Sequence, residues 1–434
     1  MDKKKVQMTK GGLAGLLIGV VLVTALIFGS SGVLAGMVIA KNRQITVWDR
    51  QNMWTDSDEA KQEAFPEDAN GMTESAEELV DEQALDKIKG LTDTIHQEYL
   101  NEGEADNTKL REGLYKGLVS GLGDIYSEYY TPEEYQKMQE SISGKYSGIG
   151  ALLNQDRTTK AISITKVFAG SPAEEVGIKA GDVIDKVNGE SVATWTLTEL
   201  VSKVKGEEGS TVDLKIYRNG EAQDFTVTRK QINVPTVSYE VLDNKVGYLQ
   251  ITEFDQVTIE QVKAALEDLD KQGAASLVVD LRDNPGGLLN GVVDILGYFI
   301  EKDKMVYTID KNGKEEDYYP STKQIWTKPM NVLINGNSAS AAEIFAAAVR
   351  DYDRGKLIGT KTYGKGIVQN TFPFNDGSAV KLTISKFYTP KGENFHGVGV
   401  EPHEKVEIDK KAMEDNKLER SEDSQLEKAI ELLK

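Results

Sequence analysis

The sequence of 434 residues contains no cysteine, only three histidines, and fewer basic than acidic side chains. Without cysteine, the chain can form neither a disulfide nor a thiolate metal site, and it has no thiol nucleophile. Its 51 basic and 70 acidic residues give a formal net charge of −19, which argues against nucleic acid as a partner because phosphate binding requires clustered cations. His96 has no metal-ligating neighbour at close spacing, and we expect no metal site.

Charged residues are also absent from positions 11–40, a run of 30 residues that exceeds the ~20 needed for a helix to cross a bilayer. Four lysines precede this run, and only one acidic residue opposes them. The positive-inside rule therefore predicts a cytoplasmic tail over residues 1–10, a transmembrane anchor over 11–40 and an extracytoplasmic remainder. A cleaved signal peptide is the alternative, since Val38-Ile39-Ala40 resembles a small-residue cleavage site, and cleavage would give a secreted form.

The next two segments differ in composition. Residues 41–73 are polar and acidic, without apolar periodicity, and are predicted to form a linker. Residues 74–137 are predicted to be a helical region, because apolar side chains recur at helical spacing over 74–102 and again over 110–122. Such amphipathic helices can pair two copies of the chain in a homodimer or cover the core of a monomer, and the sequence leaves both open.

One stretch is most typical of an active site. The apolar residues 330–334 predict a buried strand, residues 335–337 predict a turn, and the alanine-rich residues 344–352 predict a helix. Ser340 lies between turn and helix, where its hydroxyl would be exposed beside backbone amides and the positive helix end. Ser340 is therefore a candidate nucleophile. The alternative is that Ser340 and Glu343 form a capping box, the most frequent reason for a serine at such a position.

A lysine between two glycines follows this helix. Lys365 is flanked by Gly364 and Gly366, which allow a close approach of the chain and burial of the amine. A lysine acts as a general base only when it is neutral, so burial would have to lower its pKa from about 10.4 to about 7–8. Gln369, four residues further on, is expected on the same strand face, where it could orient the amine.

Together these motifs resemble a known family. Ser-Ala-Ser-Ala-Ala-Glu at 338–343, followed by Thr-Tyr-Gly-Lys-Gly-Ile-Val-Gln at 362–369, places Ser340 and Lys365 25 positions apart and resembles the carboxyl-terminal processing proteases, also called tail-specific proteases. The resemblance extends over residues 85–405. It implies that Ser340 is the nucleophile, Lys365 the base and Gln369 a supporting residue, with no metal or organic cofactor. One departure is His403, which stands where the family usually has aspartate.

Residues 138–232 resemble a PDZ domain. The pattern combines a predicted strand at 162–167, a strand, turn and strand over 181–192, and a helix at 196–204. PDZ domains bind an extended C-terminal peptide by strand addition and hold its carboxylate with backbone amides. The resemblance assigns that role to Gly148, Ile149 and Gly150, and it implies protein or peptide substrates with exposed C-termini.

The protease core is expected over residues 233–405. Predicted strands at 246–252 and 276–281 flank a helix at 257–272, which is a βαβ-like alternation. The second strand leads into Pro285-Gly286-Gly287, which is ordinary turn chemistry by itself. In the resembled family the matching glycines donate backbone N–H to the oxyanion, which implies Gly286 or Gly287, together with the amide of Ala341, as the oxyanion hole.

The sequence thus predicts a multidomain protein of α/β and α+β class. It has an N-terminal transmembrane helix, a helical N-terminal region, a PDZ domain inserted before a mixed α/β serine protease core, and a C-terminal tail and helix over residues 406–434. The predicted function is that of a membrane-anchored serine endopeptidase that recognises C-terminal peptide tails. Two alternatives are a Ser-His hydrolase that uses His396 or His403 as its base, and a non-catalytic PDZ adaptor tethered to the membrane.

Overall fold

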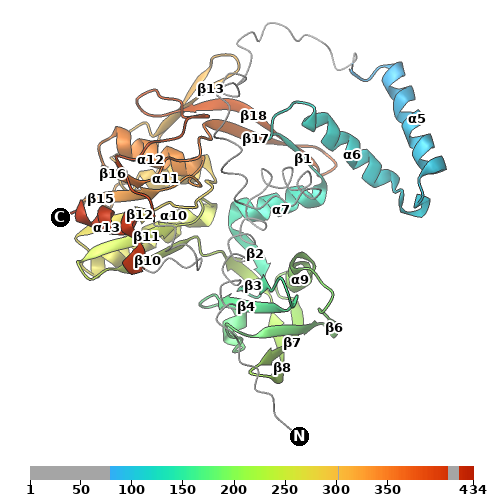
Figure 1. Cartoon of the computed structure of the whole chain (residues 1–434), viewed down its shortest axis with the longest axis horizontal. Coiled ribbons are helices and arrows are strands. Elements are labelled where there is room, and N and C mark those ends of the chain that lie inside the picture. Colours follow the sequence, from blue (N-terminus) through green and yellow to red (C-terminus); the bar gives the residue numbers. More distant parts are fainter. Residues whose placement is uncertain (1–78, 302, 409–419) are drawn as a thin grey trace. The chain divides into compact units, whose positions relative to one another are not determined.

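The structure is a computed structural model that describes residues 79–301, 303–408 and 420–434 (Figure 1). The predicted cytoplasmic tail, transmembrane anchor and acidic linker lie outside these residues. No helix in the described ranges combines the length and the apolar character needed to cross a bilayer. The described residues form two units, one of residues 79–131 and 372–381 and the other of residues 132–301, 303–371, 382–408 and 420–434.

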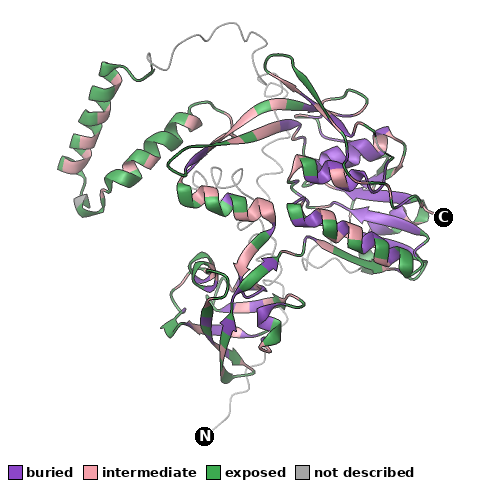
Figure 2. Cartoon of the chain, turned by 180° about the vertical axis from the view of Figure 1, so that it is seen from behind, coloured by how far each residue is buried: buried purple, intermediate pink, exposed green. Residues whose placement is uncertain are grey.

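The smaller unit begins with the two helices that apolar spacing predicted, α5 (Glu82–Glu98) and α6 (Asn107–Ser120). Each helix starts directly after an aspartate, Asp81 or Asp106, whose carboxylate accepts a backbone N–H of the first turn. Neither helix contains a buried residue, and Figure 2 shows both as mostly exposed. The unit also contains η1 (Glu102–Glu104) and β1 (Glu128–Tyr130), which pairs antiparallel with residues 379–381.

The larger unit contains the PDZ-like domain. Five strands follow the order β3-β4-β5-β7-β8, with β6 paired to β5, and β2 pairs separately with β9. The helix α9 begins with a capping box between Thr196 and Glu199 and contacts β3, the edge strand of the sheet. The elements are α7 (Pro132–Ser143), β2 (Lys145–Gly148), β3 (Ala151–Gln155), β4 (Ile162–Val167), α8 (Pro172–Glu175), β5 (Val183–Val187), β6 (Glu190–Ser191), α9 (Leu197–Val204), β7 (Thr211–Arg218), β8 (Glu221–Thr228) and β9 (Lys230–Asn233).

The protease-like core of this unit is built on a six-stranded sheet in the order β10-β11-β12-β15-β16-β19. Neighbours from β11 to β19 are parallel, and β10 is antiparallel to β11. Because the carboxyl ends of parallel strands meet at one edge of a sheet, the loops after β12, β15 and β16 lie at the same edge. The strands are β10 (Val237–Val241), β11 (Val246–Ile251), β12 (Ser276–Asp280), β15 (Met330–Ile334), β16 (Gly355–Gly359) and β19 (Glu404–Lys405).

Side chains alternate along the central strands between two apolar clusters. Leu277 and Val279 of β12 pack in the cluster formed with α10 (Gln256–Lys271), α11 (Leu289–Leu296) and α12 (Ala341–Asp351). Val278 between them packs instead with Leu426 of α13 (Ser424–Glu431). The strands are therefore buried on both faces, as the purple ribbons of Figure 2 show. Strands that are buried on both faces have continuous apolar sequences, and the sequence predicted these strands for that reason.

The remaining strands of the core belong to a second sheet. β13 pairs with β14 and with residues 385–388 of β18, and β17 also pairs with β18. The elements are β13 (Val306–Asp310), β14 (Glu315–Tyr318), β17 (Ile367–Pro373), β18 (Ala379–Tyr388) and the short η2 (Arg420–Glu422) before α13.

Candidate active site

Three loops meet at the carboxyl edge of the core sheet. The loop after β12 carries the Gly-Gly pair, the turn after β15 carries Ser340, and the loop after β16 carries Lys365. The turn binds the first loop through Ala339, whose N–H donates to the carbonyl of Asn284 at 2.9 Å. The third loop binds the turn through Tyr363, whose N–H donates to a turn carbonyl at 3.1 Å. Backbone bonds thus bring together candidate residues that are distant in sequence.

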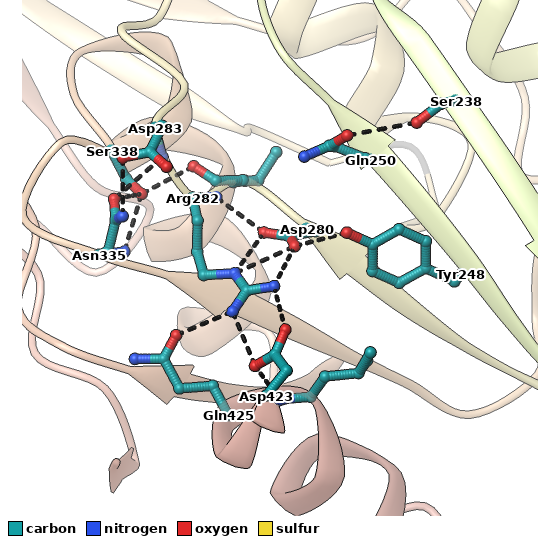
Figure 3. Close-up of polar contacts among 12 residues, drawn as sticks. Ser238, Tyr248, Gln250, Asp280, Arg282, Asp283, Asn335, Ser338, Asp423 and Gln425 are labelled. Atoms are coloured by element: carbon teal, nitrogen blue, oxygen red, sulfur yellow. Dashed lines mark hydrogen bonds and ion pairs between the residues drawn. The ribbon is translucent and has the colours of Figure 1, made fainter. Parts of the chain in front are cut away.

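The two serines of the turn have different surroundings. The hydroxyl of Ser338 is fully buried, donates to the carbonyl of Leu281 at 2.8 Å and accepts the N–H of Asn335 at 2.9 Å. These two bonds make it a structural link between β12 and the turn (Figure 3). Ser340 is half-buried at the start of α12. Of the two hydroxyls, only that of Ser340 has the partial exposure that a nucleophile requires.

Ser340 has a backbone conformation that few residues other than glycine adopt. Its φ is 54° and its ψ is −114°. Such a conformation costs of order 1–3 kcal/mol and persists only where the surroundings enforce it. Here the bond from Ala339 to Asn284 holds one side, and the N–H of Ser340 donates to the Glu343 carboxylate at 2.9 Å on the other. The predicted capping box between Ser340 and Glu343 is therefore present, but a capping serine normally has an extended backbone.

Glu343 connects the serine turn to the lysine loop. It is fully buried in the first turn of α12 and accepts four hydrogen bonds. Oε1 accepts the Thr362 hydroxyl at 2.5 Å and the Gly364 N–H at 2.7 Å, whereas Oε2 accepts the N–H of Lys365 at 2.7 Å and that of Ser340 at 2.9 Å. One carboxylate therefore fixes the backbone on both sides of the candidate dyad.

The protonation of Glu343 follows from these contacts. Burial raises its pKa, while the four donated hydrogen bonds act in the opposite direction and leave a net increase. Three of the four partners are backbone N–H groups, which can only donate, whereas the Thr362 hydroxyl can also accept a hydrogen bond.

Lys365 lies in a loop and not in a strand. The expectation that Lys365 and Gln369 share a strand face was wrong, because β17 begins at Ile367. Glu343 binds the N–H of Lys365, and Gly364 has a φ of 95°, so the backbone here cannot join a ladder. Gln369 does lie in β17, and its side-chain amide donates to the Thr383 hydroxyl on β18 at 3.3 Å.

The Gly-Gly loop lies directly against the serine turn. A Cβ on Gly286 would lie 2.8 Å from the Cβ of Ser340, and a Cβ on Gly287 would lie 2.5 Å from the carbonyl oxygen of Phe254. Both positions therefore require glycine. The N–H of Gly286 donates to the side-chain oxygen of the buried Asn284 at 2.8 Å, whereas no hydrogen bond from the N–H of Gly287 or Ala341 occurs within the described residues.

Two carboxyl groups flank the residue that anchors this loop. The N–H of Phe254 donates to the carbonyl of Gly286 at 2.9 Å. Burial raises the pKa of Glu253 and of Asp255 on either side, and the charge of Asp255 adds to the increase at Glu253. The loop is thus anchored in surroundings that favour the neutral form of a carboxyl group.

The two histidines of the core lie in different places. The N–H of His403 donates to the carbonyl of Leu357 at 2.8 Å, and its Nδ1 accepts the Leu357 N–H at 2.9 Å. Burial lowers the pKa of His403, in agreement with a neutral ring that accepts this bond. His403 therefore completes the edge of β16. His396 packs against Gly366, where a Cβ would lie 2.5 Å from the His396 nitrogen.

The predicted peptide-binding residues lie where β2 passes into β3. Gly148 ends β2, and Ile149 and Gly150 form the turn before β3. The carbonyl of Ile149 accepts the N–H of Ala173, and that of Gly150 accepts the N–H of Phe168, each at 2.9 Å. The turn therefore leads into an edge strand beside α9, which is the geometry of peptide binding by strand addition.

The fold and the three loops define a class of protein, namely a serine hydrolase joined to a PDZ domain. Sequence profiles agree with this class. Peptidase family S41 matches residues 245–406, the PDZ domain matches residues 163–218, and the activating protease CtpB N-terminal domain matches residues 26–134.

Relatives are similar over most of the chain. A probable CtpA-like serine protease of Staphylococcus haemolyticus (strain JCSC1435) is 39% identical over 75% of this chain and 65% of the relative, so the chain spans just under two thirds of that protein. Carboxy-terminal processing protease CtpA of Bacillus subtilis (strain 168) is 38% identical over 75% of this chain and 69% of the relative. The photosystem II D1 C-terminal processing protease has 24% identity and a TM-score of 0.42, over 74% of this chain and 92% of that one. The chain belongs to the carboxyl-terminal processing protease family.

Sequence reasoning missed two residues of this site. Glu343 was considered only as a capping partner, although a single acidic residue in the otherwise apolar run 341–349 is a signal of a buried carboxylate with several donors. The second residue is Asn284. Its side-chain amide donates to the carbonyl of Ile251 at 2.8 Å, and its side-chain oxygen accepts the N–H of Gly286. In the sequence, only its position before the Pro-Gly-Gly turn could have indicated this role.

We predict that Glu343→Gln lowers both stability and peptidase activity. The amide turns one acceptor into a donor, which leaves at least one backbone N–H of the four donors without a partner, and an unpaired buried donor costs about 1–3 kcal/mol. Denaturant unfolding and the rate of peptide hydrolysis check this. The exposed Glu401→Gln is the matched control and should change stability by less than about 0.5 kcal/mol. Unchanged stability and activity in Glu343→Gln would contradict the role of Glu343.

Proposed function

We propose that the chain is a serine endopeptidase that cleaves proteins with exposed C-termini through a Ser340-Lys365 dyad. One observation carries the proposal: the buried carboxylate of Glu343 holds the backbone of both residues, one of them in a strained conformation. Strain that is enforced at one serine is typical of a catalytic group and has no use in a scaffold. Membership of a protease family supports the same function.

Acyl transfer follows from this arrangement. Ser340 Oγ attacks the scissile carbonyl while the neutral amine of Lys365 takes the hydroxyl proton. Lys365 returns this proton to the leaving amine as the C–N bond breaks, which releases the C-terminal fragment and leaves an acyl-enzyme. Water then attacks the ester, again with Lys365 as the base. Gln369 supports the lysine amine from β17, and the residues require no metal or organic cofactor for these steps.

The oxyanion is stabilised by the N–H groups of Gly287 and Ala341. Both belong to segments that contact Ser340, whereas the N–H of Gly286 is occupied by Asn284. Gly286 instead allows the loop to approach the serine turn. Loss of one oxyanion-hole donor typically lowers the catalytic rate by about 10²–10³-fold, and we assign a contribution of this size to each of the two amides.

Substrate recognition uses the PDZ domain. A substrate tail adds as a strand to β3, its side chains face α9, and the backbone of Gly148, Ile149 and Gly150 receives its carboxylate. The second candidate function, a non-catalytic adaptor, would use the same groove. It leaves the enforced strain at Ser340 without an explanation.

We predict that Ser340→Ala and Lys365→Ala each reduce cleavage by the full chain by at least about 10³-fold, because each removes a group that takes part in bond formation. The substrate is an unfolded protein that ends in small apolar residues. The control is His396→Ala combined with His403→Asn, in which asparagine keeps an acceptor for Leu357, and it should retain most of the activity. Loss of activity in this control would favour the Ser-His alternative. A bound but uncleaved tail with every variant, wild type included, would favour the adaptor.

We also propose that residues 11–40 remain as an anchor, with the N-terminus in the cytoplasm and the catalytic part outside. The uncharged run and the four lysines before it support this orientation. We predict that the full chain stays with bacterial membranes after an alkaline wash and that added protease digests its catalytic part in intact protoplasts. The double variant Leu22→Arg with Leu26→Arg should abolish this retention, because each arginine costs about 2.5–3.5 kcal/mol at the centre of a membrane helix. A shortened protein in the medium would instead support the cleaved signal peptide.

We further propose a homodimer formed through α5 and α6. Leu114 and Leu118, one helical turn apart on α6, are 46% and 57% exposed and lie on one face. We predict that the full chain in detergent sediments as a dimer, and that Leu114→Glu with Leu118→Glu gives a monomer because charges cannot be buried without partners. Lys109→Glu on the same helix is the control and should leave the dimer intact. A monomeric wild-type protein would contradict the proposal.

A further inference from the structure

The last helix of the chain begins beside the loop that follows β12 (Figure 3). Asp423 is its N-cap, and Oδ1 of this residue accepts the N–H of Leu426 at 3.0 Å. The same carboxylate faces the guanidinium group of Arg282, with Nη1 at 2.9 Å and Nη2 at 2.8 Å. Gln425 accepts a further bond from Nη1 at 3.1 Å. The C-terminal segment thus binds, through a two-pronged ion pair, a residue 141 positions earlier.

Arg282 is shared between two carboxylates. Its Nε and Nη2 also donate to Oδ2 of Asp280 at the end of β12, at 3.0 and 2.6 Å, and the Tyr248 hydroxyl donates to the same oxygen at 2.7 Å. The side chains of Arg282, Asp280 and Asp423 are only 11%, 1% and 6% exposed. Burial lowers the pKa of Arg282, but its bonds to both carboxylates outweigh this and raise the pKa overall. Removal of one carboxylate therefore leaves a buried cation with half of its partners.

The backbone of Arg282 begins the loop that carries Gly286 and Gly287. The next residue, Asp283, has a φ of 60° and is bound by the serine turn. Its N–H donates to Asn335 at 3.0 Å, and its carboxylate accepts the amide of Asn337 at 2.8 Å. The start of the loop is therefore held on one side by the serine turn and on the other, through Arg282, by the C-terminal segment.

We propose that Asp423 is a positioning residue: by holding Arg282, it fixes the loop 282–287 so that the N–H of Gly287 points at the oxyanion. The proposal rests on the oxyanion assignment made under the proposed function. The C-terminal segment is then part of the catalytic machinery, although none of its residues contacts the reacting atoms. Misplacement of a reacting group by about 1 Å can cost roughly 100-fold in rate, so a small displacement of the loop is enough for a measurable effect.

A purely structural role of α13 is the competing explanation. Leu426 and Ala429 pack on the face of the sheet opposite α12, and the side-chain amide of Asn331 donates to the Ala429 carbonyl at 2.8 Å. Deletion of the helix would expose this face and unfold the core whatever Asp423 does. The test must therefore separate the charge of Asp423 from its capping bond and from the packing of the helix.

Three single variants make this separation. Asp423→Asn keeps an oxygen that caps the Leu426 N–H, because asparagine caps as well as aspartate, but it removes the negative charge from Arg282. Leu426→Val weakens the packing of α13 and leaves the pair of Asp423 and Arg282 intact. We expect Asp423→Asn in the full chain to lower kcat for peptide hydrolysis by about 10- to 100-fold with an unchanged KM. Asp423→Glu should recover part of this loss, and Leu426→Val should keep the wild-type kcat.

A second measurement reports on the loop without catalysis. Hydrogen exchange of the full-length Ser340→Ala protein, with and without Asp423→Asn, follows the amides of residues 281–288. We expect faster exchange of this segment in Asp423→Asn and not in Leu426→Val. Equal exchange in all variants, or a kcat that falls in Leu426→Val as much as in Asp423→Asn, would overturn the proposal. If the wild-type protein cleaves no substrate, the proposed peptidase is refuted. If Asp423→Asn still speeds the exchange of residues 281–288 in that case, the link between Asp423 and the loop is kept.

Discussion

The buried carboxylate of Glu343 is the constraint on which the site depends. It lies on the first turn of α12, and its two oxygens hold the N–H of Ser340 and the N–H of Lys365, together with two further donors of the lysine loop. A buried acceptor with four donors cannot move without leaving several of them unsatisfied, and each would cost about 1–3 kcal/mol. The relative position of the two backbones is therefore set by a residue that takes no part in bond formation.

The sheet explains why this carboxylate can reach both loops. β12, β15 and β16 are adjacent and parallel, so the segments that leave them emerge side by side at one edge. The strands are packed on both faces, by α12 on one and by α13 on the other, and this leaves the edge as the place for irregular backbone. Gly286 then lets the first segment approach the serine turn, and Gly287 lets it approach the backbone of Phe254, more closely than any residue with a Cβ would allow.

The sequence predicted most of the elements and part of the site. Apolar runs such as 330–334 identified the strands correctly because strands buried on both faces have no polar alternation to obscure them. The position of Lys365 was predicted less well, since the start of β17 is set by Glu343, a residue distant along the chain. The choice between Gly286 and Gly287 depends on a side-chain bond from Asn284, and the link from Asp423 to Arg282 spans two ends of the core. Neither contact leaves a periodic or local trace in the sequence.

A buried carboxylate and a buried ionic cluster hold the loops of the site. Glu343 binds the backbone of Ser340 and Lys365, and Asp280, Arg282 and Asp423 hold the start of the glycine loop. Buried charges add little net stability compared with apolar packing, but they are directional and costly to rearrange. A strained serine needs that property more than it needs additional stability, because its conformation persists only while its neighbours cannot relax. The support from Glu343 uses the backbone N–H groups of Ser340 and Lys365.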